Sequence, residues 1–193
     1  MDRSYCFLGD SVTQAAYIKN GWVNQIREYL ELKYQDEFVN VYNLGIGGNT
    51  TEDLLDRIDE LKARNPTHII IVIGVNDTRY LQGQELEADQ ERRFVDNMEL
   101  IIKISKEYSG NLLIVGLVIG DDSQLQPLPD GDGHCYNQER VELFNSRLKE
   151  LASRHTIPFV DLLATLQAND FSDGLHPNQQ GHNKIFGEIR RFI

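Results

Sequence analysis

Short apolar runs alternate along the chain with longer segments in which apolar residues recur every three or four positions. Each run has the length of one strand, and polar or glycine-rich residues end it. The predicted strands lie at residues 5–8, 38–42, 67–73, 112–118 and 157–162. The run at 67–73 is rich in β-branched residues and has no polar alternation, which is typical of a central parallel strand buried on both faces.

The segments between these runs carry their apolar residues on one face of a helix. Spacings of three and four residues predict helices at 21–34, 51–61, 94–105, 141–151 and 185–192. Thr50 or Thr51 is a suitable N-cap for the second of these helices. Acidic Glu52 and Asp53 then fall in its first turn, where the helix dipole favours negative charge.

Strands and helices alternate from one end of the chain to the other. This order predicts an α/β fold with a five-stranded parallel sheet, right-handed crossovers and helices on both faces. With 193 residues and no internal repeat or linker-like tract, the chain is expected to form a single domain over residues 1–193. The connection at 120–137 is longer than most loops in a compact domain. We expect it to shape a substrate pocket.

Charge and hydropathy limit the partners of the protein. A formal net charge of −11 disfavours broad contact with a phosphate backbone, so nucleic acid is not an expected partner. No apolar run approaches the roughly 18 residues that a membrane span requires. The apolar run near the N-terminus is shorter than the core of about 7–15 residues in a signal peptide. We therefore expect no integral membrane segment and a cytoplasmic location, while the oligomeric state stays open.

The sequence gives no reason to expect a metal or a cofactor. Cys6 and Cys135 are expected to be reduced thiols, because neither has neighbouring ligands at a metal-binding spacing. Residues 130–134 resemble the start of a calcium loop. However, the sixth position of that loop is not glycine, and Val141 stands at the twelfth position, where a bidentate glutamate is needed.

Four polar or glycine-rich segments follow predicted strands. They read Gly-Asp-Ser at 9–11, Gly-Ile-Gly-Gly-Asn at 45–49, Gly-Val-Asn-Asp at 74–77 and Asp-Gly-Leu-His-Pro at 173–177. The carboxyl ends of parallel strands lie on the same edge of a sheet, where open α/β sheets bind their ligands. We therefore expect the four segments to meet there.

These segments contain the groups that acyl transfer requires. Ser11 is a candidate nucleophile, His176 can take its proton, and Asp173 can fix the imidazole tautomer. The backbone N–H groups of Ser11 and Gly48 and the side-chain amide of Asn76 are candidate donors to the oxyanion of a tetrahedral intermediate. Each feature also has an ordinary structural explanation, as a tight turn, a helix cap or a surface histidine.

Taken together, the four segments resemble the sequence blocks of the SGNH hydrolases, also called the GDSL esterase/lipase family. The resemblance extends over nearly the whole chain, in the same order and with similar spacing. It implies a three-layer α/β/α sandwich with a flavodoxin-like strand order of 2-1-3-4-5. It also implies a catalytic triad in which Ser11 is the nucleophile, Asp173 and His176 complete the set, and Asp10 supports the serine.

The same resemblance implies an oxyanion hole. Its donors would be Ser11, Gly48 and Asn76. If Gly48 is not the glycine that donates, Gly47 is the alternative. Val75 stands where many members of the family carry a second glycine. This departure should leave the Asn76 amide in place.

The leading functional hypothesis is a cofactor-independent serine ester hydrolase for small or short-acyl esters, since no lid helix or long apolar loop is evident. Lysophospholipids, acyl thioesters and acetylated sugars are alternative substrates. His134, on the long loop, is a rival to His176 as the histidine that takes the serine proton. A nucleotide- or flavin-binding module could use residues 45–51 at a helix N-terminus, but the segment lacks the Lys-Ser/Thr ending of a P-loop. A catalytically silent binding protein on the same fold is the third alternative.

Overall fold

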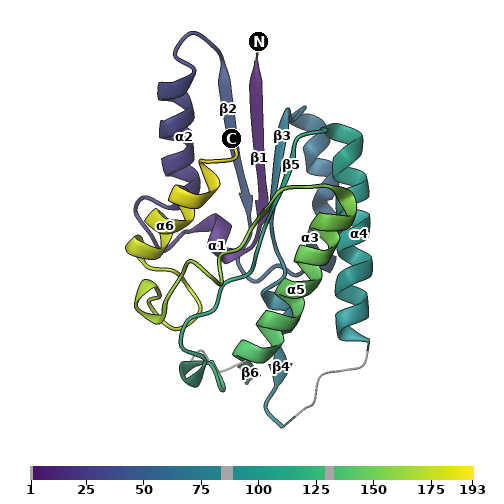
Figure 1. Cartoon of the computed structure of the whole chain (residues 1–193), viewed down its shortest axis with the longest axis vertical. Coiled ribbons are helices and arrows are strands. Elements are labelled where there is room, and N and C mark those ends of the chain that lie inside the picture. The colour runs from purple at the N-terminus through teal and green to yellow at the C-terminus, as the bar shows by residue number, and fades with distance from the viewer. Residues whose placement is uncertain (1, 84–88, 129–132) are drawn as a thin grey trace.

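Parallel strands form the central sheet of the molecule (Figure 1). The computed structural model describes residues 2–83, 89–128 and 133–193. Within these residues the sheet has five strands, β1 (Arg3–Gly9), β2 (Val39–Gly45), β3 (His68–Val72), β5 (Leu112–Val115) and β7 (Phe159–Val160). Their spatial order is β2-β1-β3-β5-β7 and every neighbouring pair is parallel. Counted along the sheet strands alone, this is the predicted order 2-1-3-4-5.

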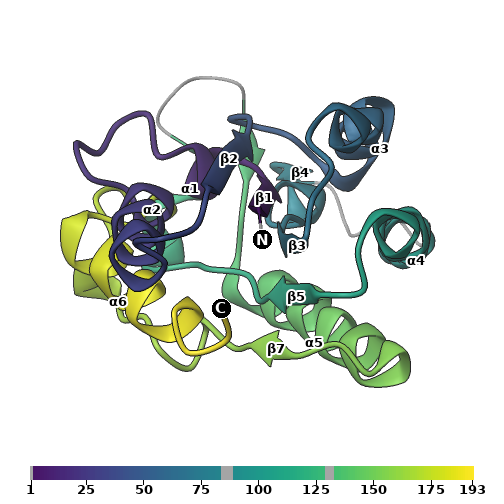
Figure 2. The same cartoon turned by 90° about the horizontal axis from the view of Figure 1, so that it is seen from above.

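Helices cover both faces of the sheet, which gives the three layers of an α/β/α sandwich (Figure 2). One face carries α2 (Trp22–Lys33) and α6 (Gln179–Ile189). The other carries α3 (Thr51–Arg57), α4 (Gln90–Tyr108) and α5 (Gln138–His155). The short helix α1 (Ser11–Gln14) follows β1 directly, and a 3-10 helix at Ile58–Ala63 continues from α3.

The two faces of the sheet bury two separate cores, because successive side chains of a strand point to opposite sides. Tyr5 and Phe7 of β1 pack into the core beneath α2 and α6. Cys6 and Leu8 pack into the core beneath α3, α4 and α5. In β3, Ile71 packs into one core and Ile70 into the other, so this central strand is buried on both faces, as the apolar run at 67–73 predicted.

Some boundaries differ from those predicted. The fourth sheet strand ends at Val115, although the apolar run continues to residue 118. The reason is that the Leu117 N–H donates to the side chain of Asn145 (2.9 Å) rather than to a neighbouring strand, while Leu117 itself stays buried. The last helix begins at Gln179 and ends at Ile189, so Phe192 lies beyond it and is exposed.

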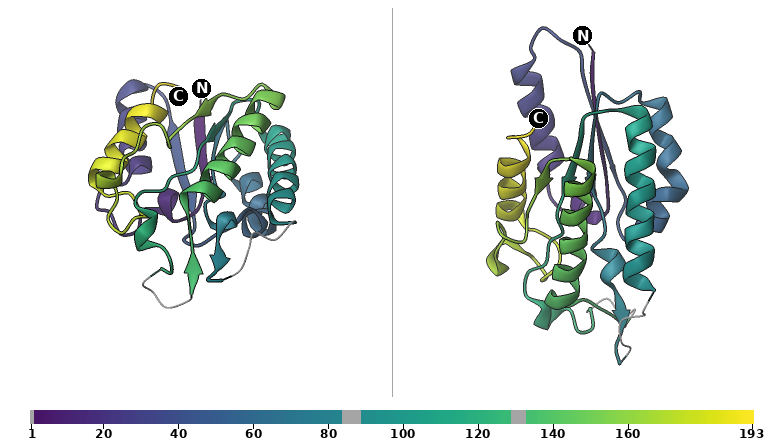
Figure 3. Two further views of the ribbon diagram at one scale, coloured as in Figure 1. Left: turned by 60° about the horizontal axis from the view of Figure 1, so that its bottom comes forward. Right: turned by 45° about the vertical axis from the view of Figure 1, so that its right-hand side comes forward.

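An additional small sheet lies at the carboxyl end of the parallel strands. Strand β4 (Tyr80–Leu81) pairs antiparallel with β6 (His134–Cys135), and the two extend below the main sheet in the left view of Figure 3. The loop predicted at 120–137 thus contains β6 and a 3-10 turn at Asp122–Gln124. Two-residue strands are too short to produce an alternating pattern in the sequence. Cys6 and Cys135 are both buried and unpaired.

Candidate active site

Ser11 lies where β1 turns into α1, at the carboxyl edge of the sheet. Gly9 makes this turn possible, since a Cβ there would lie 2.1 Å from the Thr13 hydroxyl and 2.6 Å from the Val72 carbonyl oxygen. The Asp10 carboxylate then caps α1 by accepting a hydrogen bond from the Val12 N–H (2.9 Å). The chain therefore presents the Ser11 side chain at the first residue of a helix, where it is partly exposed.

The loop before α6 brings His176 and Asp173 to Ser11. His176 Nε2 lies 3.1 Å from Ser11 Oγ, and His176 Nδ1 lies 2.7 Å from Asp173 Oδ2. The second carboxylate oxygen, Asp173 Oδ1, accepts the backbone N–H groups of Leu175 (3.0 Å) and His176 (2.7 Å). Partial burial opposes ionisation of Asp173, but these hydrogen bonds outweigh it and hold its pKa below the usual range.

Tyr17 was not among the predicted site residues, yet its ring forms a T-shaped contact with the His176 ring, with 5.0 Å between the ring centroids. It lies in the polar connection after α1 and is 43% exposed. Nothing in the spacing of apolar residues distinguishes Tyr17 from an ordinary surface aromatic. Tyr17 therefore lies against the imidazole that the Ser11 hydroxyl contacts.

Three other histidines, His68, His155 and His182, serve the fold. His68 stacks on Tyr5 with 4.3 Å between ring centroids, and His155 pairs with Glu99. His182 is fully buried, and its Nδ1 accepts the Trp22 N–H at 3.3 Å. Burial lowers the pKa of His182 to about 4, so this ring is neutral at neutral pH.

The loop after β2 lies against the end of β1, because Gly9 and Gly45 are register partners. The Gly47 N–H donates to Gln14 Oε1 (3.1 Å). Gly48 has a positive φ of 80°, which favours glycine, and its N–H has no acceptor among the described residues. Of the two glycines considered for the second donor, Gly48 is therefore the one with a backbone N–H still available.

The side-chain amide of Asn76 is held in one orientation. Its Oδ1 accepts the Tyr136 hydroxyl (2.8 Å), and its Nδ2 donates to the Asn49 carbonyl (2.9 Å). Asn76 is only 5% exposed, and its amide faces the loop that carries Gly48 and Asn49. Tyr136 comes from the predicted 120–137 loop, so that loop contributes to the site through a residue that the sequence did not single out. An aromatic residue in an otherwise polar loop was the available signal.

Asp77 connects the third sequence block to the N-terminus of α3. Its carboxylate accepts the Thr51 N–H (3.0 and 3.1 Å) and the Thr51 hydroxyl at the N-terminus of α3. Burial raises the pKa of Asp77 to about 6. Thr50 is the N-cap of this helix, as predicted, and forms a capping box with Asp53.

A cavity of about 350 Å³ adjoins Asn76. Its lining is mostly polar and includes Thr50, Asn76, Arg79, Tyr80, Asn97 and His134. His134 thus belongs to this cavity and makes no hydrogen bond to Ser11 in the described structure. Its place as a rival to His176 is not supported by this geometry.

The described residues contain no group of three or more His, Cys, Asp or Glu side chains that could hold a metal ion. Residues 130–132, which were considered for calcium, lie outside the described residues. No helix in the described ranges is long and apolar enough to cross a membrane.

Asp10 is fully buried, and the loss of solvation raises its pKa from 3.8 to about 7. Between these two pH values the folded state binds a proton that the unfolded state has released. The contribution of Asp10 to stability is therefore present below about pH 4 and lost as the pH rises through 7.

We expect Asp10→Asn to remove this dependence. At about pH 4 the variant and the wild type should have similar free energies of unfolding. At about pH 8 the variant should be more stable by up to ~4 kcal/mol, since one pKa unit corresponds to 1.36 kcal/mol. Urea titrations at both pH values measure the difference, and a constant difference would contradict an ionising buried Asp10.

A hydrogen-bonded serine, histidine and aspartate at the edge of a parallel sheet are typical of hydrolases that form acyl-enzymes. The model of the GDSL-like lipase/acylhydrolase family matches residues 7–184. The chain belongs to this family and is an ester hydrolase of the SGNH type.

Several esterases and hydrolases are similar to this protein in sequence or in fold over almost the whole chain. An acetylxylan esterase from Geobacillus stearothermophilus is 24% identical over 197 residues, which cover 91% of this chain and 87% of the relative. A crystal structure of Axe2, an acetylxylan esterase from the same organism, superposes with a TM-score of 0.78 at 21% identity, over 98% of this chain and 93% of Axe2. LAE5, an α/β hydrolase from the metagenome of Lake Arreo in Spain, gives a TM-score of 0.73 at 19% identity, over 97% and 93%.

Proposed function

We propose that the protein hydrolyses carboxylic esters through an acyl-enzyme formed on Ser11, with His176 as general base and Asp173 as its orienting carboxylate. The observation that carries the proposal is the continuous contact from Ser11 Oγ to His176 Nε2 (3.1 Å) and from His176 Nδ1 to Asp173 (2.7 Å). The aspartate accepts from Nδ1, so Nε2 is left unprotonated and can take the serine proton.

The oxyanion hole in this proposal consists of the Ser11 N–H, the Gly48 N–H and Asn76 Nδ2. Two observations support it. The Gly48 N–H has no acceptor among the described residues. Tyr136 orients the Asn76 amide so that Nδ2 faces the Gly48 loop. Donors fixed before the reaction stabilise the developing charge without reorganisation.

The reaction then proceeds in two halves. Ser11 Oγ attacks the ester carbonyl carbon while its proton moves to His176 Nε2, and the negative charge on the carbonyl oxygen is held by the hole. Collapse of this intermediate breaks the bond to the alcohol, which leaves with the proton from His176. Water, deprotonated by the same imidazole, attacks the acyl-enzyme and releases the acid and Ser11.

The relatives support the assignment of the serine and the histidine. Two structures of Axe2 are described as catalytic mutants, one with a serine and one with a histidine replaced by alanine. By similarity of fold and of sequence block, we assign these roles to Ser11 and His176.

For the substrate, we propose a short-acyl ester of a carbohydrate. The relative that is named as an acetylxylan esterase supports an acetyl group. The cavity beside Asn76 supports a hydroxylated partner for it, since Arg79, Tyr80 and Asn97 offer polar groups there. A lysophospholipid or another long-chain ester would require an extended apolar lining instead.

A nucleotide or flavin at the N-terminus of α3 is disfavoured by the same geometry. The Thr51 N–H is bound by Asp77, and the Thr50 N–H is bound by Asp53. The backbone groups that would bind a phosphate already have carboxylate partners, which also repel an anion.

An ester series tests the proposal. We expect kcat/KM for p-nitrophenyl esters to be highest with acetate and to fall at least about tenfold by octanoate, because each added methylene is worth about 1–3 kcal/mol where the site cannot accept it. Release of acetate from acetylated xylo-oligosaccharides is expected as well. A preference for palmitate would contradict the short-acyl proposal, and a folded protein that cleaves no ester would contradict the esterase.

A further inference from the structure

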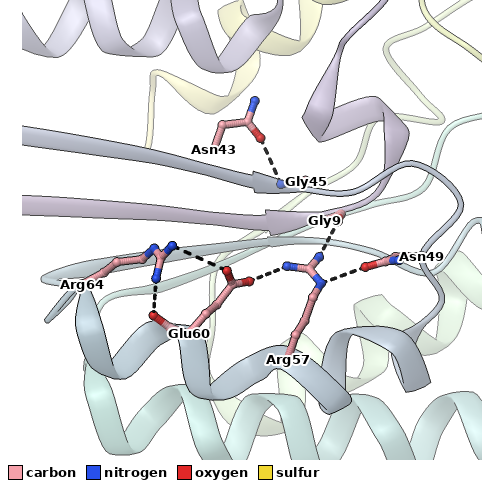
Figure 4. Close-up of polar contacts among 7 residues, drawn as sticks. All are labelled: Gly9, Asn43, Gly45, Asn49, Arg57, Glu60 and Arg64. Atoms are coloured by element: carbon pink, nitrogen blue, oxygen red, sulfur yellow. Dashed lines mark hydrogen bonds and ion pairs between the residues drawn. The ribbon is translucent and has the colours of Figure 1, made fainter.

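Arg57, the last residue of α3, extends its guanidinium toward Gly9 and Asn49 (Figure 4). Its Nη2 donates to the Gly9 carbonyl (3.1 Å) and its Nε donates to Asn49 Oδ1 (2.8 Å). Its Nη1 pairs with Glu60 on the following 3-10 helix. The side chain is only 19% exposed, so these contacts are partly shielded from water.

Both acceptors belong to segments that carry donors of the proposed oxyanion hole. Gly9 lies two residues before Ser11, and its carbonyl also accepts the Ile46 N–H at 3.1 Å. Asn49 directly follows Gly48, and its carbonyl accepts Asn76 Nδ2. One guanidinium therefore connects the end of β1 to the loop after β2.

We propose that Arg57 is a positioning residue for the oxyanion hole, an inference that rests on the proposed function. By holding Gly9 and Asn49 at the same time, it sets the separation between the Ser11 and Gly48 N–H groups. Through the Asn49 carbonyl it also sets the position of the third donor, Asn76. Among the described residues, no hydrogen bond or ion pair joins Arg57 to Ser11, His176 or Asp173, so it acts through the segments that it joins.

The chemistry of the side chain suits this task. Guanidinium is planar and offers donors in a fixed fork, so three acceptors in different directions are satisfied at once. A lysine has one ammonium at the end of a flexible stem and cannot span the same acceptors. Arg57→Lys should therefore behave like a loss of the side chain, although the charge is retained.

The primary test is Arg57→Met, which keeps much of the apolar stem. We expect kcat on p-nitrophenyl acetate to fall about 10- to 100-fold, because displacement of reacting groups by less than an ångström has effects of this size. KM should stay within about threefold, since the hole binds the transition state in preference to the ester. Asn76→Ala sets the scale, because removal of one oxyanion donor costs about 10²–10³ in kcat.

Arg64→Met is the matched control. The Arg64 side chain also binds Glu60, through the Glu60 carbonyl (2.7 Å) and carboxylate (3.8 Å), but it contacts neither Gly9 nor Asn49 (Figure 4). Titration of reactive serine with a fluorophosphonate gives the fraction of folded sites, and kcat is expressed per titrated site. We expect Arg64→Met to match the wild type on this basis. An equal loss of kcat in both variants would overturn the proposal.

Asn49→Ala removes the same connection from its other end and serves also if Arg57→Met does not fold. We expect it to lower kcat in the same way. In the double variant the loss should be smaller than the product of the two single losses, because both act on one contact. Fully multiplicative losses, or a wild-type kcat in Asn49→Ala, would overturn the proposal.

These outcomes are distinct from a failure of the proposed function. If the wild type hydrolyses no ester, or if Ser11→Ala hydrolyses it as well as the wild type, the proposed function fails. If hydrolysis depends on Ser11 and Arg57→Met retains the wild-type kcat, only the role of Arg57 is overturned.

Discussion

Replacement of Ser11 by alanine is expected to lower kcat/KM for ester hydrolysis by a factor of about 10⁴ or more, the usual effect of removing the nucleophile of a triad. The Ser11 hydroxyl contacts His176 Nε2 and lies at the first residue of α1. Alanine fits the same helical position, so the free energy of unfolding should change by no more than about 0.5 kcal/mol. Initial rates on p-nitrophenyl acetate and urea titration measure the two quantities.

The matched control is Ser146→Ala. Ser146 lies on α5, and its hydroxyl donates only to the Leu143 carbonyl of the same helix. We expect this variant to hydrolyse the ester at the wild-type rate. Substantial activity in Ser11→Ala that is not due to contaminating enzyme would show that another group attacks the ester.

The second large effect is expected from Asp173→Asn, with a loss in kcat on the order of 10³- to 10⁴-fold. The reason lies in the two backbone N–H groups, of Leu175 and His176, that bind Oδ1. They select the amide oxygen for that position and so place the amide NH₂ opposite His176 Nδ1. The imidazole must then accept at Nδ1 and carry its proton on Nε2, where it cannot take the proton of Ser11.

The loss in kcat should come from the changed tautomer of the His176 imidazole and not from a change in the fold. Asp173→Asn is therefore expected to keep the fold, and KM should change much less than kcat. Imidazole ¹⁵N chemical shifts report the position of the proton directly. A variant whose proton remains on Nδ1, or whose kcat is close to that of the wild type, would contradict this role of the carboxylate.

Much of the fold was predictable because its rules are local or topological. Alternating strands and helices leave few arrangements, and the register of Gly9 with Gly45 brings two of the four polar segments together. The contact of Ser11 with His176 follows from the same rule, although the two residues are 165 positions apart. Element ends were less predictable, since an apolar pattern marks only the buried part of an element.

The supporting contacts were not predictable from the pattern. Tyr136 reaches Asn76 across 60 residues, and Arg57 reaches Gly9 across 48. Such hydrogen bonds depend on the three-dimensional path of a loop or on the rotamer of a long side chain. Neither leaves a periodic signal, and a buried tyrosine or a partly buried arginine has many other structural roles.

The contact of Tyr136 with Asn76 has a consequence for the redesign of substrate range. The segment 120–137 would be the natural target for loop exchange with other members of the family, because loops vary more in sequence among homologues than the strands and helices that they connect. Yet its last aromatic residue, Tyr136, fixes the amide of Asn76, which is one donor of the proposed oxyanion hole. We therefore expect a graft that replaces Tyr136 to lower kcat on every ester, whereas a graft that ends at residue 135 keeps this contact.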